Sequence, residues 1–186
     1  MVCYLVRHGK DDETVRGGWS NHSLTGEGIE QVNQLGKEIA EAKLEVACIY
    51  SSDIQRAKET AMILSGYLKC SVIEMPEFRE ANNGDLAGMK NEEADDKFPG
   101  IYWSALSYDE CYPNGESPQE FFSRIKTGWE QFKEKILKKT PKDVLLVTHG
   151  GVVEAILCIE NGIEFSNKEK HFRALNAKLI PIEIRK

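Results

Sequence analysis

The sequence predicts an α/β fold: a three-layer, doubly wound and mostly parallel sheet with helices on both faces. Short apolar runs at 2–6, 46–50 and 144–147 have the composition of strands that are covered on both sides. Between them, apolar residues recur at three- or four-residue steps, which is the pattern of amphipathic helices. This alternation of strand and helix is typical of parallel strands that are joined by helices.

The first two strand and helix pairs follow one another in order. Strand 2–6 precedes a helical pattern that starts after Thr25 and contains Ile29, Val32, Leu35 and Ile39. Strand 46–50 precedes a second helical pattern, made of Ile54, Ala57, Ala61, Leu64 and Leu68. We expect both helices to cover the sheet.

A third helix has the clearest start signal. Ser117 is suited to be the N-cap, Pro118 the first helical residue, and Glu120 the capping-box partner of Ser117. The apolar stripe that follows predicts a core-facing helix; it consists of Phe122, Ile125, Trp129, Phe132 and Ile136. Strand 144–147 comes next.

The chain is predicted to form one domain over 1–186, with 85–116 as an insertion. That segment is irregular and rich in turn residues, and it interrupts the alternation. Ligands of such sheets bind beyond the carboxyl ends of the strands, so we expect the insertion to lie over the active site. Its aromatic residues fit two roles equally well, stacking on a ligand or forming a small core; they are Phe98, Tyr102, Trp103, Tyr108 and Tyr112.

Composition points to a small-molecule partner. The formal net charge is −6 and there is no run of Lys or Arg, so neither nucleic acid nor an anionic membrane is an expected partner. The opening MVCYLVRHGK resembles neither a secretory signal nor a membrane span, and the five cysteines include no CxxC pair. A cytoplasmic location is therefore expected. The sequence carries no signal for the oligomeric state.

Two histidines follow predicted strands. The first strand runs into Arg7-His8-Gly9, and strand 144–147 runs into Thr148-His149-Gly150-Gly151. Both imidazoles should emerge at the same edge of the sheet, because the carboxyl ends of parallel strands meet there. The adjoining glycines allow backbone N–H groups to approach a ligand closely.

Two arginines are expected at the same edge. Arg7 directly precedes His8, and Arg56 lies in the first turns of the helix that follows strand 46–50. Two guanidinium groups and two imidazoles would form a positive pocket that suits a phosphate group, because guanidinium forks match its oxygens.

At this point the motifs resemble those of a known family. They are Arg7-His8-Gly9, Ser51-Ser52 with Arg56-Ala57 and Thr60-Ala61, Phe78-Arg79-Glu80 with Gly84 and Gly88, Gly115-Glu116-Ser117 and Thr148-His149-Gly150-Gly151. In this order they resemble the histidine phosphatase superfamily, which has the phosphoglycerate mutase-like fold. The resemblance covers nearly the whole chain.

The resemblance implies a metal-independent phosphomonoesterase that needs no cofactor and acts on a small-molecule phosphate ester. It implies that His8 is the nucleophile and forms a phosphohistidine, that Arg7, Arg56 and His149 bind phosphate, and that Glu80 donates a proton. Gly150 would add a backbone N–H to the phosphate site. Nearby arginines keep His8 neutral, as nucleophilic attack requires.

The loop after His8 departs from the family pattern. Many members read RHG-x-Ser/Thr and then Trp-Asn, where this chain has Lys10-Asp11-Asp12-Glu13-Thr14. Thr14 takes the place of the usual asparagine, and its hydroxyl is expected to donate to phosphate. Asp11, Asp12 and Glu13 are expected to repel highly anionic substrates.

Three alternatives remain open. A phosphoglycerate-type mutase is disfavoured because the insertion has eight carboxylates against Lys90 and Lys97; they are Asp85, Glu92, Glu93, Asp95, Asp96, Asp109, Glu110 and Glu116. A metallohydrolase using His8, His22 and His149 is disfavoured by the two adjacent arginines. A non-catalytic module that only binds phospho-ligands is the third.

Overall fold

The computed structural model describes residues 1–139 and 142–185, which form an α/β protein around a five-stranded sheet. The strand order is β3-β2-β4-β1-β5. The strands are β1 (Val2–Arg7), β2 (Ile49–Ser51), β3 (Val72–Glu74), β4 (Val144–Thr148) and β5 (Leu179–Glu183). All neighbouring pairs are parallel except β1 with β5, which is antiparallel.

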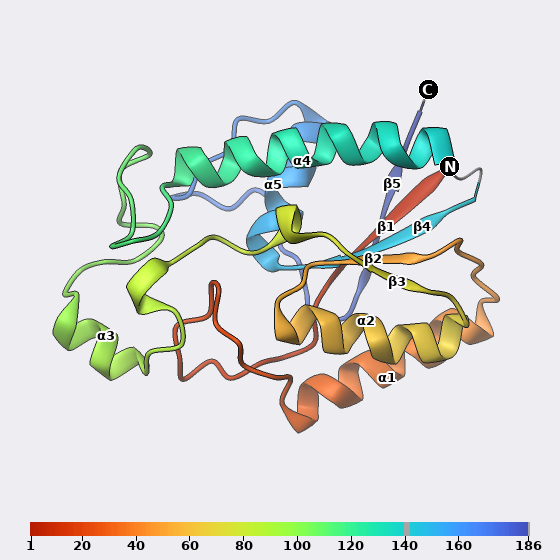
Figure 1. Ribbon diagram of the computed structural model, residues 1–186, viewed down its shortest axis with the longest axis horizontal. Coiled ribbons are helices and arrows are strands. Elements are labelled where there is room, and N and C mark those ends of the chain that lie inside the picture. The colour runs from red at the N-terminus through yellow and green to blue at the C-terminus, as the bar shows by residue number, and fades with distance from the viewer. Residues whose placement is uncertain (140–141, 186) are drawn as a thin grey trace.

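Helices cover both faces of this sheet. They are α1 (Gly26–Glu41), α2 (Gln55–Leu68), α3 (Asn91–Lys97), α4 (Pro118–Lys139) and α5 (Gly150–Asn161), with short 3₁₀ turns η1 (Pro76–Phe78) and η2 (Gly84–Leu86). Figure 1 shows α1 and α2 on one side of the strands and α4 and α5 on the other, with α3 set apart from both layers. The three-layer, mostly parallel architecture predicted from the sequence is confirmed.

The two apolar layers follow from the alternation of side chains along the strands. Val6 and Val147 belong to the layer under α1 and α2, together with Val32 of α1. Their neighbours Leu5 and Leu146 belong to the layer under α4 and α5. Every residue of β4 is buried, which explains its uninterrupted apolar sequence.

The start of α4 has the predicted capping box. The backbone N–H of Glu120 donates to Ser117 Oγ at 3.1 Å, and the Ser117 N–H donates to Glu120 Oε2 at 2.9 Å. The predicted stripe is buried except at its first residue. Phe121 is fully buried in place of Phe122, whose ring stacks on Phe165 with ring centroids 4.8 Å apart.

Some elements differ from the predicted ones. The second strand starts at Ile49 and not at 46, and the sequence patterns did not indicate β3, β5 or α5. Segment 85–116 contains α3 and a small core of Leu86, Ala94, Leu106 and Tyr112, but no strand. In the described ranges, no helix is both long enough and apolar enough to cross a bilayer.

Candidate active site

A cavity of about 830 Å³ opens beyond the carboxyl ends of β1 and β4. Its floor and sides combine the end of β1, the following loop, α2, the segment after η1 and the start of α5. The predicted site residues that line it are Arg7, His8, Arg56, Glu80 and Gly150. The strand-end rule therefore located the cavity correctly.

His8 is fixed in one tautomer. Its backbone N–H donates to Thr148 O at 2.9 Å, which ties the end of β1 to the end of β4. Its Nδ1 lies 2.7 Å from Gly9 O, and a carbonyl oxygen can only accept, so Nδ1 carries the proton. Burial, with Arg56 and then Arg7 as further causes, holds the His8 pKa well below its usual value. The lone pair of the neutral ring is therefore on Nε2.

Arg56 faces that lone pair from α2. Its side chain is almost fully buried, and its Nε donates to His8 Nε2 at 3.1 Å. Nη2 donates to Gly18 O at 2.8 Å and Nη1 to Ser20 O at 3.2 Å, so carbonyl groups hold the plane of the guanidinium. Gly18 has a φ of +55°, and a Cβ there would lie 1.9 Å from Asn83 Oδ1. Only glycine fits at this turn.

His149 lies next to His8 and is not one of the residues that line the cavity. It is fully buried, and the two imidazole centroids are 5.1 Å apart in an edge-on arrangement. Nε2 of His149 is 2.8 Å from Ser52 Oγ. Burial, followed by Arg56 and His8, lowers the His149 pKa well below its usual value.

Two buried polar atoms in the residues next to His8 lack a hydrogen-bond partner within the described part of the chain. They are His149 Nδ1 and Arg7 Nε. The Nη1 of Arg7 is used, since it donates to Ala174 O at 3.1 Å. Buried polar groups normally have partners, so a site that leaves these two atoms free beside a second cation, Arg56, suits an anionic ligand.

Glu80 lies in the same cavity and is held from several directions. Its Oε2 accepts from the Gly151 N–H at 3.1 Å and its Oε1 from the Ala81 N–H at 3.0 Å. Its backbone carbonyl accepts from Trp19 Nε1 at 2.7 Å and Arg124 Nη2 at 3.1 Å. A Cβ at Gly151 would lie 2.5 Å from Glu80 Oε1, so the carboxyl group needs glycine there.

The structure does not bring Thr14 to the cavity. The Thr14 side chain is exposed and its hydroxyl donates to Asp12 Oδ1 at 2.7 Å, which makes a local turn. The prediction of Thr14 as a phosphate donor is thus at odds with its position. Asp11 points inward in its place, with Oδ2 3.2 Å from Arg56 Nε.

The insertion faces the cavity with aromatic groups and not with carboxylates. Within the described residues, none of its eight carboxylates lines the cavity, so the charge argument drawn from them is wrong. Asp95 pairs with Arg16, and Glu116 pairs with Arg124 at 2.6 Å. The small core predicted as one role of the aromatics is confirmed, with Tyr112 in it and Trp103 packed against it, and both side chains also line the cavity.

Several residues of the cavity wall were not predicted from the sequence. Asn167, Lys168 and Lys170 reach it from the segment after α5, and Glu154 reaches it from α5. His22, a candidate metal ligand, does not line it. In residues 1–139 and 142–185 no three His, Cys, Asp or Glu side chains are placed to hold a metal ion.

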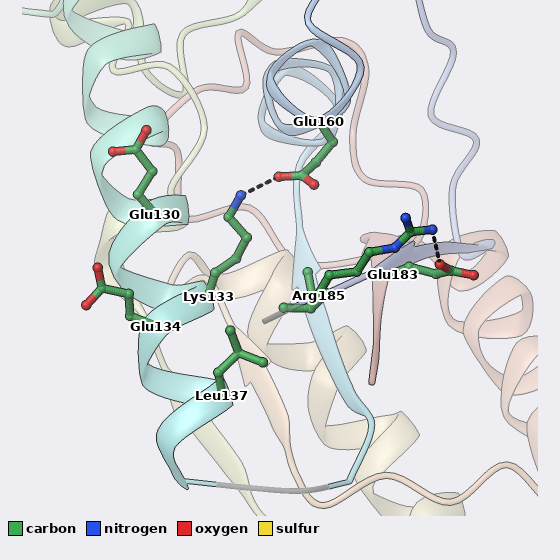
Figure 2. A pocket seen from close by; sticks show the side chains of 8 residues that line it. Glu130, Lys133, Glu134, Leu137, Glu160, Glu183 and Arg185 are labelled. Carbon is green, nitrogen blue, oxygen red and sulfur yellow. Dashed lines mark hydrogen bonds and ion pairs between the residues drawn. The ribbon is translucent and has the colours of Figure 1, made fainter.

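A second hollow, of about 550 Å³, lies between α4, α5 and β5. Figure 2 shows two ion pairs among the side chains that line it, Lys133 with Glu160 and Arg185 with Glu183. Glu183 pairs with Val2 in the sheet, at the opposite end of β1 from His8. The hollow is therefore remote from both histidines.

Comparisons with known proteins agree with this geometry. A model of the histidine phosphatase superfamily (branch 1) matches residues 3–186. The uncharacterized phosphatase PhoE of Bacillus subtilis (strain 168) is 31% identical over 159 residues, which span 84% of this chain and 75% of that protein. The metal-independent phosphoserine phosphatase of Arabidopsis thaliana is 33% identical over 159 residues, 82% of this chain and 65% of that protein.

The α-ribazole phosphatase of Shigella flexneri has the same fold, with a TM-score of 0.85 and 22% identity over 100% of this chain and 92% of the other. Phosphoglycerate mutases also occur among the relatives. The phosphatases among these proteins support a phosphatase-type hydrolase. With a match over nearly its whole length, the chain belongs to branch 1 of the histidine phosphatase superfamily.

Proposed function

We propose that the protein is a metal-independent phosphomonoesterase in which His8 Nε2 attacks the phosphorus of a small-molecule phosphate ester. The observation that carries this proposal is the hydrogen bond from His8 Nδ1 to Gly9 O, because it leaves the lone pair on Nε2, at the cavity. Attack forms the phosphohistidine, with a new N–P bond, and breaks the bond from phosphorus to the alcohol oxygen.

The phosphate oxygens would be bound by Arg7, Arg56 and His149, with the first N–H groups of α5 at Gly150. The free Arg7 Nε and His149 Nδ1 support this assignment, because a phosphate would supply the partners that they lack. If the Ser52 hydroxyl donates to His149 Nε2, then Nδ1 carries the proton and donates to phosphate as a neutral imidazole. Fixed donors of this kind stabilise the charge of the transferring phosphoryl group.

Glu80 would serve both half-reactions. It gives its proton to the departing alcohol oxygen, and as a carboxylate it then takes a proton from the water that attacks the phosphohistidine. That water breaks the N–P bond, which releases phosphate and restores His8. The hydrogen bonds from the backbone N–H groups of Gly151 and Ala81 to the carboxyl oxygens support this role, because they fix the position of the side chain.

No metal or cofactor is part of this proposal. Arg7 and Arg56 supply permanent positive charge at the nucleophile, and a divalent cation in the same place would be repelled by both.

We also propose that residues 1–186 act as one domain, with 85–116 as a wall of the substrate site. The unpaired thiols of the five cysteines support a cytoplasmic location.

Among substrates, we propose monophosphates of aromatic or apolar alcohols. Tyr102, Trp103 and Phe165 line the outer cavity and offer surface on which a leaving group can stack. A mutase remains the second candidate, because phosphoglycerate mutases are among the relatives and Lys168 and Lys170 line the cavity. Asp11, Asp12 and Glu13 line it as well, and they oppose a second phosphate.

The proposal is tested by hydrolysis of p-nitrophenyl phosphate in excess EDTA. The wild-type protein should keep its activity, and His8→Ala should lose at least about a hundredfold because the covalent route is removed. Strong inhibition by EDTA that zinc or magnesium reverses would contradict the metal-free mechanism. No turnover of any phosphate ester would instead favour the non-catalytic module.

A further inference from the structure

The proposed phosphate site already contains a carboxylate of the protein, that of Asp11. The Asp11 carboxyl group is mostly buried, lines the cavity, and has its Oδ2 3.2 Å from Arg56 Nε. The same Nε lies 3.1 Å from His8 Nε2. Arg56 Nε therefore donates to the nucleophile and also lies within ion-pair distance of the Asp11 carboxylate, in the place where an incoming phosphate would bind.

The backbone at Asp11 is anchored where it stands. Asp11 forms an antiparallel bridge with Leu24, and the Leu24 N–H donates to Glu59 Oε2 of α2 at 2.7 Å. The Lys10 N–H donates to Gln31 Oε1 of α1 at 3.0 Å. The carboxylate is thus held beside the phosphate donors by contacts on both sides.

The charged groups around Asp11 interact with other groups of the site as well as with its carboxylate. Arg56 of α2 and Arg7 at the end of β1 act on it with positive charge, and Glu13 acts on it with negative charge from its own loop. The neutral His8 reaches this group through its contact with Arg56 Nε. Arg56 is also under the charge of Glu80, from the segment after η1. Burial raises the Asp11 pKa more than Arg56 and Arg7 lower it. Proton uptake by this carboxyl is therefore easier than for an exposed aspartate.

We propose that Asp11 is a specificity-determining residue. Because of Asp11, the site binds a phosphate ester together with one proton, which the Asp11 carboxyl group and a phosphate oxygen share. This assignment rests on the proposed phosphatase function. The proton comes from solvent, and the Asp11 O–H donates to the phosphate oxygen at the place where an ionised Asp11 would repel it. An ionised Asp11 thus excludes a fully ionised ester.

Inorganic sulfate tests this assignment, because it remains a dianion from about pH 5 to about pH 8 and cannot supply the proton itself. Calorimetric titration at constant ionic strength in two buffers of different ionisation enthalpy gives both the affinity and the number of protons taken up. The wild-type protein should take up about one proton per sulfate near neutral pH, and its dissociation constant should rise about tenfold per pH unit.

Asp11→Asn is the test variant and Asp12→Asn is the matched control. Asp11→Asn should bind sulfate without proton uptake and at least about tenfold more tightly than wild type near pH 7.5. Asp12 belongs to the same acidic loop and its Oδ1 accepts from Thr14, so Asp12→Asn should keep the wild-type proton uptake. Asp11→Ser serves as a second test variant if the asparagine variant fails to fold.

Equal proton uptake in wild type and Asp11→Asn would overturn the assignment, since another group would then take the proton. Failure of sulfate to bind the folded Asp11 variants would overturn it too, because the carboxylate would not be what keeps the anion out. Sulfate binding involves no turnover. A protein that shows the expected proton uptake but forms no phosphohistidine would refute the proposed function and leave the Asp11 assignment supported.

Discussion

Nε of Arg56 lies 3.1 Å from Nε2 of His8, so a permanent cation donates its hydrogen bond to the atom that we propose as the nucleophile. Burial first, and then the charge of Arg56, keep the imidazole neutral by lowering its pKa, and the contact marks the direction in which the lone pair points. The hydrogen bond from Arg56 to His8 must break when a phosphate binds, because Nε2 cannot accept from Arg56 and attack phosphorus at the same time. Arg56 Nε–H would then donate to a phosphate oxygen.

The Arg56→Lys substitution should lower kcat/KM for p-nitrophenyl phosphate by about 10²–10³, as expected for loss of a donor to a developing charge. Lysine has neither the Nε nor the fork that reaches Gly18 O and Ser20 O. Steady-state kinetics measure the effect. Arg79→Lys is the control, because Arg79 pairs with Asp53 outside the cavity lining and its change should stay within about twofold. Equal losses in both variants would contradict a specific role for Arg56.

Replacement of Glu80 by glutamine should slow hydrolysis by an amount that depends on the leaving group. Hydrolysis of an alkyl phosphate should slow by about 10²–10⁴, the usual range for general acid catalysis, and p-nitrophenyl phosphate much less because its leaving group needs no proton. The measurement is kcat/KM for a series of leaving groups of different pKa. Glu77→Gln, three residues earlier and outside the cavity lining, should show no such trend. A uniform loss across the series for Glu80→Gln would rule out the acid role.

Stability should fall as the pH drops below about 6.5, the usual pKa of histidine in an unfolded chain. His8 and His149 have folded-state pKa values well below that value, so in this window the unfolded state binds more protons than the folded one. Each histidine contributes a slope of up to about 1.4 kcal/mol per pH unit to the free energy of unfolding.

Urea unfolding of wild type and of the His8→Asn/His149→Asn double variant, measured between about pH 5.5 and about pH 7, compares the two slopes directly. The double variant should have the smaller slope, and His171→Asn, which changes an exposed histidine, should keep that of wild type. Identical slopes in all three proteins would mean that the two buried histidines do not titrate as described.

Substrate preference should favour monophosphates of aromatic alcohols over bisphosphorylated glycerate or fructose in a panel ranked by kcat/KM at one ionic strength. The acidic loop Asp11–Glu13 opposes a second phosphate, and the aromatic wall favours a planar leaving group. Bisphosphates that lead by tenfold or more would contradict this, as would conversion of 3-phosphoglycerate to 2-phosphoglycerate faster than phosphate release. In that case, a loss of bisphosphate activity in the Lys168→Ala/Lys170→Ala double variant would identify these lysines as the second anion site.

The sequence indicated the parts of the site that stand on regular structure. His8 and His149 follow strands and Arg56 lies in the first turn of a helix, so the direction of the elements places all three. α5 was not foreseen because it is apolar on nearly every side, with Val152, Val153, Ala155 and Ile156 buried, and so lacks an amphipathic period. β5 lies at a sheet edge and contains a proline, which weakens its strand pattern.

The loop after His8 was beyond sequence reasoning for a different reason. It has no period, and whether Asp11 or Thr14 turns inward depends on long-range contacts such as the bridge from Asp11 to Leu24. The same holds for the carboxylates of the insertion. Glu116 turns away from the cavity to pair with Arg124 of α4, and Asp95 pairs with Arg16. Such partners are separated along the chain and have no local signature.

Trapping of the covalent intermediate tests the central claim most directly. The protein is mixed briefly with a ³²P-labelled phosphomonoester, quenched, and its labelled peptide is sequenced by mass spectrometry. The label should sit on His8 through a bond that is stable in alkali and labile in acid, and His8→Ala should carry none. A wild-type protein that releases phosphate with a single inversion at phosphorus, and without label on His8, would contradict the phosphohistidine mechanism.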